Sequence, residues 1–102
     1  MNEFCSLLGL CRRAGRLSMG FEAVKAALVS GKAKAVFAAC DLSEKTCKEL
    51  RYHAGEKAEV IRVNIPSKTL SDAIGFKVGT LSIDDEGFAK KAILLCDGGI
   101  RL

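Results

Sequence analysis

Hydrophobic residues recur at helical spacing near the start of the chain. They lie three or four residues apart, which is typical of a helix with one buried face. Asn2 is a suitable N-cap before this pattern, and Gly15 is a common residue after a helix end. We therefore predict a helix over about residues 3–14, whose apolar stripe consists of Phe4, Leu7, Leu8 and Cys11.

A second apolar stripe begins shortly afterwards. Gly20 precedes it, and Phe21, Val24 and Leu28 repeat at helical spacing until Ser30 and Gly31. The pattern predicts a second helix between these glycines. A short strand over 17–19 would connect the two helices.

The period changes after Gly31. Residues 33–39 form a short apolar run, too brief for a helix and bounded by polar residues, which indicates a buried strand. Asp41 and Glu44 have the spacing of a capping box. They predict the start of a third helix over about 42–54, which ends at Gly55.

The second half of the chain repeats this alternation. A strand is predicted around Val60–Val63, then a short helix capped by Ser67 and ended at Gly75, and then a strand over 78–83. Three consecutive acidic residues, 84–86, suit the start of a last helix, which Gly98 and Gly99 would terminate.

Alternating helices and strands favour an α/β fold. We predict a three-layer α/β/α sandwich around a small mixed sheet of about four strands. A chain of 102 residues suits one domain over 1–102. It has no apolar run of about 20 residues, and its first residues are acidic, so we expect a cytoplasmic protein with no membrane association.

The five cysteines do not form a recognisable ligand or disulfide pattern. They are Cys5, Cys11, Cys40, Cys47 and Cys96, and no two are separated by only two residues. We interpret them as small buried residues. Cys40, Cys47 and His53 are the best metal candidates, but the last two are predicted on different faces of one helix, so we expect no metal and no cofactor.

The positive charge is concentrated in the first third of the chain. Residues 1–34 contain six Lys or Arg and two Glu, whereas the remaining 68 residues contain ten cationic and ten acidic side chains. An excess of four charges on one edge is typical of a surface that binds a polyanion. An ordinary solvated face explains it equally well.

The segment from Gly15 to Glu22 favours the functional interpretation. A glycine-flanked turn leads into a helix whose first N–H groups lack partners, and these groups attract phosphates. Arg13 and Arg16 would add electrostatic attraction. Glu22 is explained either by the helix dipole or by acceptance of a hydrogen bond from a base.

The order of these segments resembles a known family. The relevant runs are 7–17, 20–26, 30–34, 39–41, 65–75 and 85–90. Together they are similar to the YlxQ-like bacterial branch of the kink-turn-binding ribosomal-protein superfamily. The resemblance spans nearly the whole chain and implies the same three-layer sandwich.

The resemblance also implies a site. In the superfamily, RNA contacts come from a Gly-x-Asn-Glu-x-x-Lys pattern at the start of the second helix and from a loop before the last strand. Gly20 matches the glycine, Glu22 stands at the asparagine position, and Ala23 and Ala26 replace the glutamate and lysine. The implied RNA-binding residues are Arg13, Arg16, Gly20, Phe21, Glu22, Lys25, Phe76, Lys77 and Val78. We expect Arg13, Arg16, Gly20, Glu22 and Lys77 to share one surface.

The resulting hypothesis is a non-enzymatic protein that binds structured, kink-turn-like RNA. Ribosomal RNA is one candidate partner, and ribosomal proteins are others. The alternative is a protein-interaction module of the same fold, with Phe76 and Val78 forming an exposed apolar patch. Catalysis is the weakest hypothesis, because His53 is the only histidine and no phosphate-binding loop is present.

Overall fold

A computed structural model describes residues 3–96 and 99–102. Helices and strands alternate along these residues. Their bounds are α1 Glu3–Arg13, β1 Leu17–Met19, α2 Phe21–Val29, β2 Ala35–Ala38, α3 Glu44–Ala54, β3 Glu59–Arg62, α4 Ser67–Ile74, β4 Thr80–Ile83, α5 Glu86–Leu95 and β5 Ile100–Arg101. In this part of the chain, no helix is long and apolar enough to cross a membrane.

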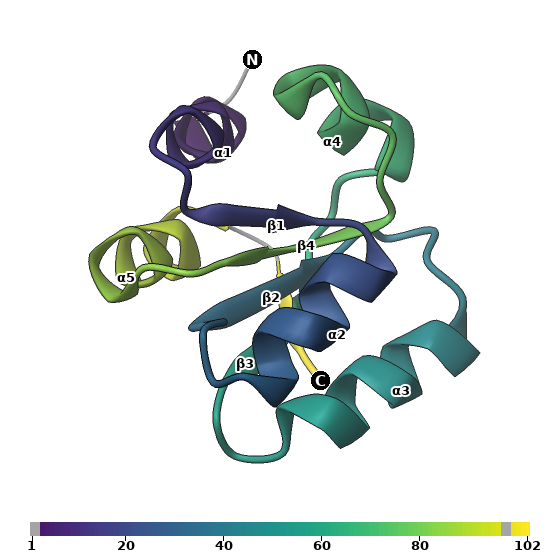
Figure 1. The fold of residues 1–102 in the computed structure, drawn as a ribbon. Helices are drawn as coiled ribbons and strands as arrows, with labels where there is room; N and C mark the ends of the chain where they lie inside the picture. Colours follow the sequence, from purple (N-terminus) through teal and green to yellow (C-terminus); the bar gives the residue numbers. More distant parts are fainter. Residues whose placement is uncertain (1–2, 97–98) are drawn as a thin grey trace.

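The five strands form one mixed sheet in the order β1-β4-β2-β3-β5. Only β2 and β3 run parallel, and the other neighbours are antiparallel. Figure 1 shows α1, α4 and α5 on one face of the sheet and α2 and α3 on the other. The predicted three-layer sandwich is confirmed. The sheet has one strand more than predicted, because β5 consists of two exposed residues with no hydrophobic pattern.

Alternating side chains of the sheet feed two separate cores. Phe37 and Leu81 pack with α1, α4 and α5, whereas Val36 and Val60 pack with α2 and α3. Phe37 also makes an edge-to-face contact with Phe4 of α1, with ring centroids 5.2 Å apart. The alternation explains why the central strands β2 and β4 read as short apolar runs, since both of their faces are covered.

Two predicted helix caps are wrong. Helix α3 begins at Glu44, and its N-cap is Ser43, whose hydroxyl accepts a hydrogen bond from the N–H of Thr46 at 3.2 Å. The Asp41 carboxylate instead accepts hydrogen bonds from the N–H and the hydroxyl of Ser67, both at 2.9 Å. Helix α4 begins at Ser67, so Ser67 is not its N-cap. The N-cap position of α4 is Pro66. The acceptor for this helix start comes from a distant segment, which local spacing does not reveal.

The acidic residues at the start of α5 have two different roles. Within the run predicted to start this helix, Asp85 is the N-cap, and its carboxylate accepts from the N–H of Phe88 at 2.9 Å. Asp84 is buried, and accepts hydrogen bonds from the hydroxyls of Ser18 at 2.5 Å and Ser82 at 2.8 Å. Helix α5 ends at Leu95. The predicted Asn2 cap and the Gly98 part of the predicted terminator lie outside the described residues.

The prediction that all five cysteines are buried is wrong for Cys40, which is exposed. It lies two residues after the end of β2 at Ala38. Cys5, Cys11 and Cys47 are buried, and Cys96 is partly buried.

Candidate nucleic-acid interface

Gly20 fixes the junction between β1 and α2. Its N–H donates to the carbonyl of Thr80 at 3.0 Å, so pairing between β1 and β4 extends one residue beyond Met19. Its φ of 91° lies in the region that favours glycine. Helix α2 has no side-chain cap at this end. Its first N–H groups and the positive end of its dipole therefore favour an anion.

The loop between α4 and β4 is held at its base. The Ser71 hydroxyl accepts from the N–H of Val78 at 2.9 Å and donates to the carbonyl of Ser67 at 2.7 Å. The N–H of Phe76 donates to the Ser71 carbonyl at 3.2 Å. Phe76, half exposed, and Lys77, also exposed, form the tip of this anchored loop.

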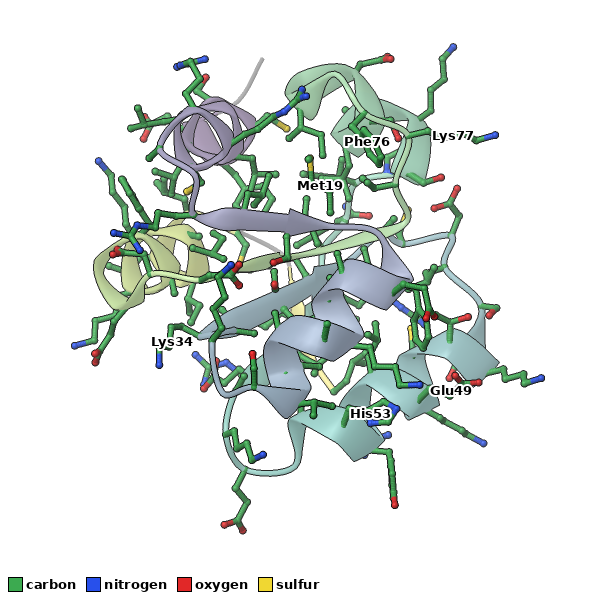
Figure 2. The ribbon with its side chains drawn as sticks, viewed as in Figure 1. Met19, Lys34, Glu49, His53, Phe76 and Lys77 are labelled. Carbon is green, nitrogen blue, oxygen red and sulfur yellow. The ribbon has the colours of Figure 1, made fainter. Side chains whose placement is uncertain are left out.

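The structure brings this loop next to the start of α2. Thr80, which follows the loop, is the residue that pairs with Gly20. A hollow of about 620 Å³ lies beside the loop, and Lys68 and Lys77 are the cations that line it. Figure 2 shows Lys77 extending away from the body of the molecule, whereas Met19 points toward the face that carries α4. Two segments far apart in sequence thus form one exposed surface.

The shared surface expected for the two arginines stays a prediction, in which Arg16 and Gly20 lie at opposite ends of β1. The N–H of Asp84 donates to the carbonyl of Arg16 at 2.9 Å, so Arg16 lies at the opposite end of β1 from Gly20. At roughly 3.3 Å per residue, this places the two backbones about 13 Å apart. Arg13 ends α1, and its Nη1 lies beside Gly9 on the side of α1 where the carbonyl of Ala73 in α4 also approaches. The charge excess of residues 1–34 is therefore spread over both ends of β1.

Arg12 contacts the end of α4, directly before the loop. Its guanidinium donates a hydrogen bond to the carbonyl of Ile74 in the last turn of α4, close to Gly75. A cation at this position neutralises the negative end of the helix dipole and places positive charge beside the loop. Local sequence patterns do not reveal this contact, because it joins residues 62 positions apart.

The remaining predicted residues differ in accessibility. Glu22 is exposed, Lys25 is partly buried, and Phe21 packs partly against the core beneath α2. Val78 is only 5% exposed and belongs to the core on the other face. Its side chain is thus not available to a base or a partner protein, and the apolar patch predicted for the alternative function reduces to Phe76.

The best metal candidates from the sequence do not converge. Among residues 3–96 and 99–102, no group of three His, Cys, Asp or Glu side chains is placed to hold a metal ion. The sulfur of Cys47 instead accepts a hydrogen bond from Arg62 at 2.9 Å, and Arg62 also pairs with Glu44 at 2.9 Å. These contacts with Cys47 and Glu44 raise the pKa of Arg62.

Comparison with known proteins shows the family of this chain. Residues 3–93 match the ribosomal protein L7Ae/L30e/S12e/Gadd45 family. The chain belongs to this family. A relative from Enterococcus faecium, called RNA-binding protein YlxQ, is 34% identical over 93 residues, which make up 91% of this chain and 90% of the relative.

A solved structure confirms the fold of this family member. A protein from Bacillus halodurans, described as having unknown function, superposes with a TM-score of 0.87 at 31% sequence identity. The match covers 95% of this chain and 99% of the other. The predicted resemblance to kink-turn-binding ribosomal proteins is thus confirmed at the level of family and fold.

Proposed function

We propose that this chain is a non-enzymatic RNA-binding protein of the cytoplasm. Its interface consists of the start of α2 and the α4–β4 loop. The hydrogen bond between Gly20 and Thr80 carries the proposal, because it joins an uncapped helix start to the loop that presents Phe76 and Lys77. Family membership and the name of the Enterococcus faecium relative support RNA as the ligand.

Structured RNA of the kink-turn type is the proposed substrate class. The helix start offers N–H donors and Glu22, an exposed acceptor, while Phe76 offers a half-exposed ring for an unstacked base. Ala23 and Ala26 are exposed on α2 and lack groups that hydrogen bond to base edges. Each missing pair costs about 1–3 kcal/mol of discrimination. We therefore propose modest affinity in isolation and a site completed by ribosomal RNA or ribosomal proteins.

A binding titration tests the proposal. The probes are a hairpin with a kink-turn and the same hairpin with its G·A pairs replaced by Watson–Crick pairs, each at 50 and 200 mM salt. Wild-type protein should prefer the kink-turn hairpin, and its affinity should fall steeply with salt. Lys77→Glu should weaken binding at least fivefold.

Lys91→Glu is the matched control. Lys91 is exposed on α5, outside the proposed interface. Its substitution changes the net charge by the same amount as Lys77→Glu. Equal effects of the two substitutions would show that only net charge matters, which contradicts the proposed interface. Affinity that does not depend on salt would contradict RNA binding through this surface.

A further inference from the structure

A large groove lies at the other end of the sheet. It has a volume of about 1020 Å³ and lies where β2 and β3 begin, with Lys34 preceding one strand and Glu59 starting the other. The second half of α3, the α3–β3 turn, α5 and the end of the chain form its walls. The Gly20–Thr80 junction lies where β2 ends, since Thr80 pairs with Ala38. Figure 2 accordingly shows Lys34 and Lys77 on opposite sides of the molecule.

The groove is strongly basic. Three carboxylates line it, and two of them already pair with cations of the same groove, Arg101 with Glu59 and Lys90 with Glu86, each at 3.5 Å. The cations that line it are Lys34, Lys48, Arg51, Lys57, Lys90 and Arg101. Once the two ion pairs are set aside, four cations face a single carboxylate. Among the described residues, none of these four has an ion-pair partner.

Folding creates this charge separation. The ten cations and ten acids after residue 34 balance in the sequence, but five of those cations and only three of those acids line the groove. Asp41 is used to begin α4 and Asp84 is buried under its serine partners. Arg16 and Lys32 lie at the same end of the sheet, because the backbone of Arg16 and the ammonium of Lys32 both contact Asp84. The groove thus continues a basic rim.

An exposed aromatic ring stands on the wall of the groove. Tyr52 is 82% exposed, and its only described ring contact is an edge contact with His53 at 5.3 Å between centroids. Stacking of an exposed ring of this size on another flat surface is favourable, because it removes apolar area from water. Lys48 and Arg51 lie on the same helix, four residues and one residue before it. Cations beside an exposed ring are the combination that holds single-stranded nucleic acid.

We infer that this groove is a second RNA-binding surface, which holds a single-stranded segment through its phosphates and through a base stacked on Tyr52. The inference rests on the proposed function and adds a surface to it. With interfaces at both ends of the sheet, one molecule could bind a folded RNA element and a neighbouring single strand together.

Fluorescence anisotropy with a labelled twelve-nucleotide oligouridine at 50 and 200 mM salt tests the inference. Lys48→Glu with Arg51→Glu should weaken binding at least tenfold. It should also reduce the slope of log affinity against log salt by about 1.4, the value for two phosphate contacts on a single strand. Lys45→Glu with Lys91→Glu, an exposed pair outside the groove with the same charge change, should weaken binding less than threefold. Equal effects of the two pairs would overturn the inference.

Tyr52 variants test the stacking contact separately. Tyr52→Ala should weaken oligouridine binding about fivefold or more without changing the salt slope, and Tyr52→Phe should retain wild-type affinity. A twelve-residue polyglutamate peptide should bind at least tenfold more weakly than the oligouridine. Equal binding of the peptide would assign the groove to acidic proteins and overturn the inference.

The two interfaces can fail independently. Lys68→Glu with Lys77→Glu changes the first interface and should weaken binding of the kink-turn hairpin more than binding of oligouridine. If only this pair affects RNA binding, the groove is not an RNA surface and the proposed function stands. If only the groove pair has an effect, the groove stands and the proposed interface is wrong. Thermal unfolding should show that all three double charge variants remain folded, because the substituted side chains are exposed.

Discussion

The carboxylate of Asp41 accepts hydrogen bonds from both the N–H and the hydroxyl of Ser67, each at 2.9 Å. This contact connects the segment after β2 with the first turn of α4. The carbonyl of Ser67 in turn accepts a hydrogen bond from the Ser71 hydroxyl. The same hydroxyl accepts from the N–H of Val78 at the base of the α4–β4 loop. The position of the proposed RNA-binding loop therefore depends on a carboxylate 26 residues before α4.

Replacement of Asp41 should make the melting temperature less sensitive to a fall in pH. The two hydrogen bonds from Ser67 lower the pKa of Asp41 below its ordinary value of 3.8. A lowered folded-state pKa contributes stability above pH 3.8, and that contribution is lost as the pH falls through the lower value. Asp41→Ala should thus melt at a lower temperature than wild type at pH 7, and the difference should shrink at pH 3.

Asp72→Ala is the control for this prediction. Asp72 is exposed on α4, the helix whose first residue Asp41 contacts. It has no hydrogen bond or ion pair among the described residues. Its replacement should leave the melting temperature nearly unchanged at both pH values. A difference between Asp41→Ala and wild type that stays constant from pH 7 to pH 3 would contradict the role of the charged carboxylate.

The buried Asp84 should make its serine partners important for stability. Ser82 is fully buried on β4 and donates to Asp84 at 2.8 Å. Ser82→Ala would leave a buried carboxylate with one donor fewer, which costs about 1–3 kcal/mol. Urea unfolding measures the loss. Ser6→Ala, at an exposed position on α1, should change the free energy of unfolding by less than about 0.5 kcal/mol.

The cysteines should differ in reactivity. Burial, with a smaller contribution from Asp85, raises the pKa of Cys11 to about 11 from its ordinary value of 9.0. At pH 8 the thiolate population is therefore about a hundredfold lower than in the unfolded chain. Iodoacetamide should modify exposed Cys40 first and Cys11 only after unfolding, as read by mass spectrometry. Comparable rates at Cys40 and Cys11 in the folded protein would contradict this.

Most of the fold follows from local patterns in the sequence. The stripe that includes Phe4 and Leu8 marks α1, because it packs into one core, and the run around Phe37 marks β2, because its alternate side chains pack into both cores. Gly20 was predicted to open α2, and it does so with a backbone conformation that favours glycine. Elements without such a pattern, like the two exposed residues of β5, could not be predicted.

The candidate interface was predicted less completely, because it depends on which end of a strand each residue reaches. Gly20 and Lys77 come together only through the antiparallel pairing of β1 with β4, and the same pairing moves Arg16 to the far end. Neither the spacing nor the charge of residues in the sequence shows that β1 runs antiparallel to β4. The basic groove was missed for a related reason, since its charges balance along the chain and separate only on folding.

Restoration of the family pattern at the start of α2 should strengthen kink-turn recognition. Ala23 and Ala26 stand where the family pattern has glutamate and lysine, and both are exposed, so larger side chains fit without changing the core. Ala23→Glu with Ala26→Lys leaves the net charge unchanged. Each new contact with a base edge adds about 1–3 kcal/mol of discrimination, so the preference for kink-turn over paired hairpin should rise at least tenfold.

The swapped pair, Ala23→Lys with Ala26→Glu, is a control with the same composition. It places the same two side chains on the same exposed turn of α2 but in reversed order. Attraction between α2 and RNA phosphates is the same to a first approximation, so this variant should show no gain in preference. If the swapped pair gained as much as the restored pair, helix charge rather than base contacts would account for the effect. The start of α2 would then bind RNA without reading its G·A pairs.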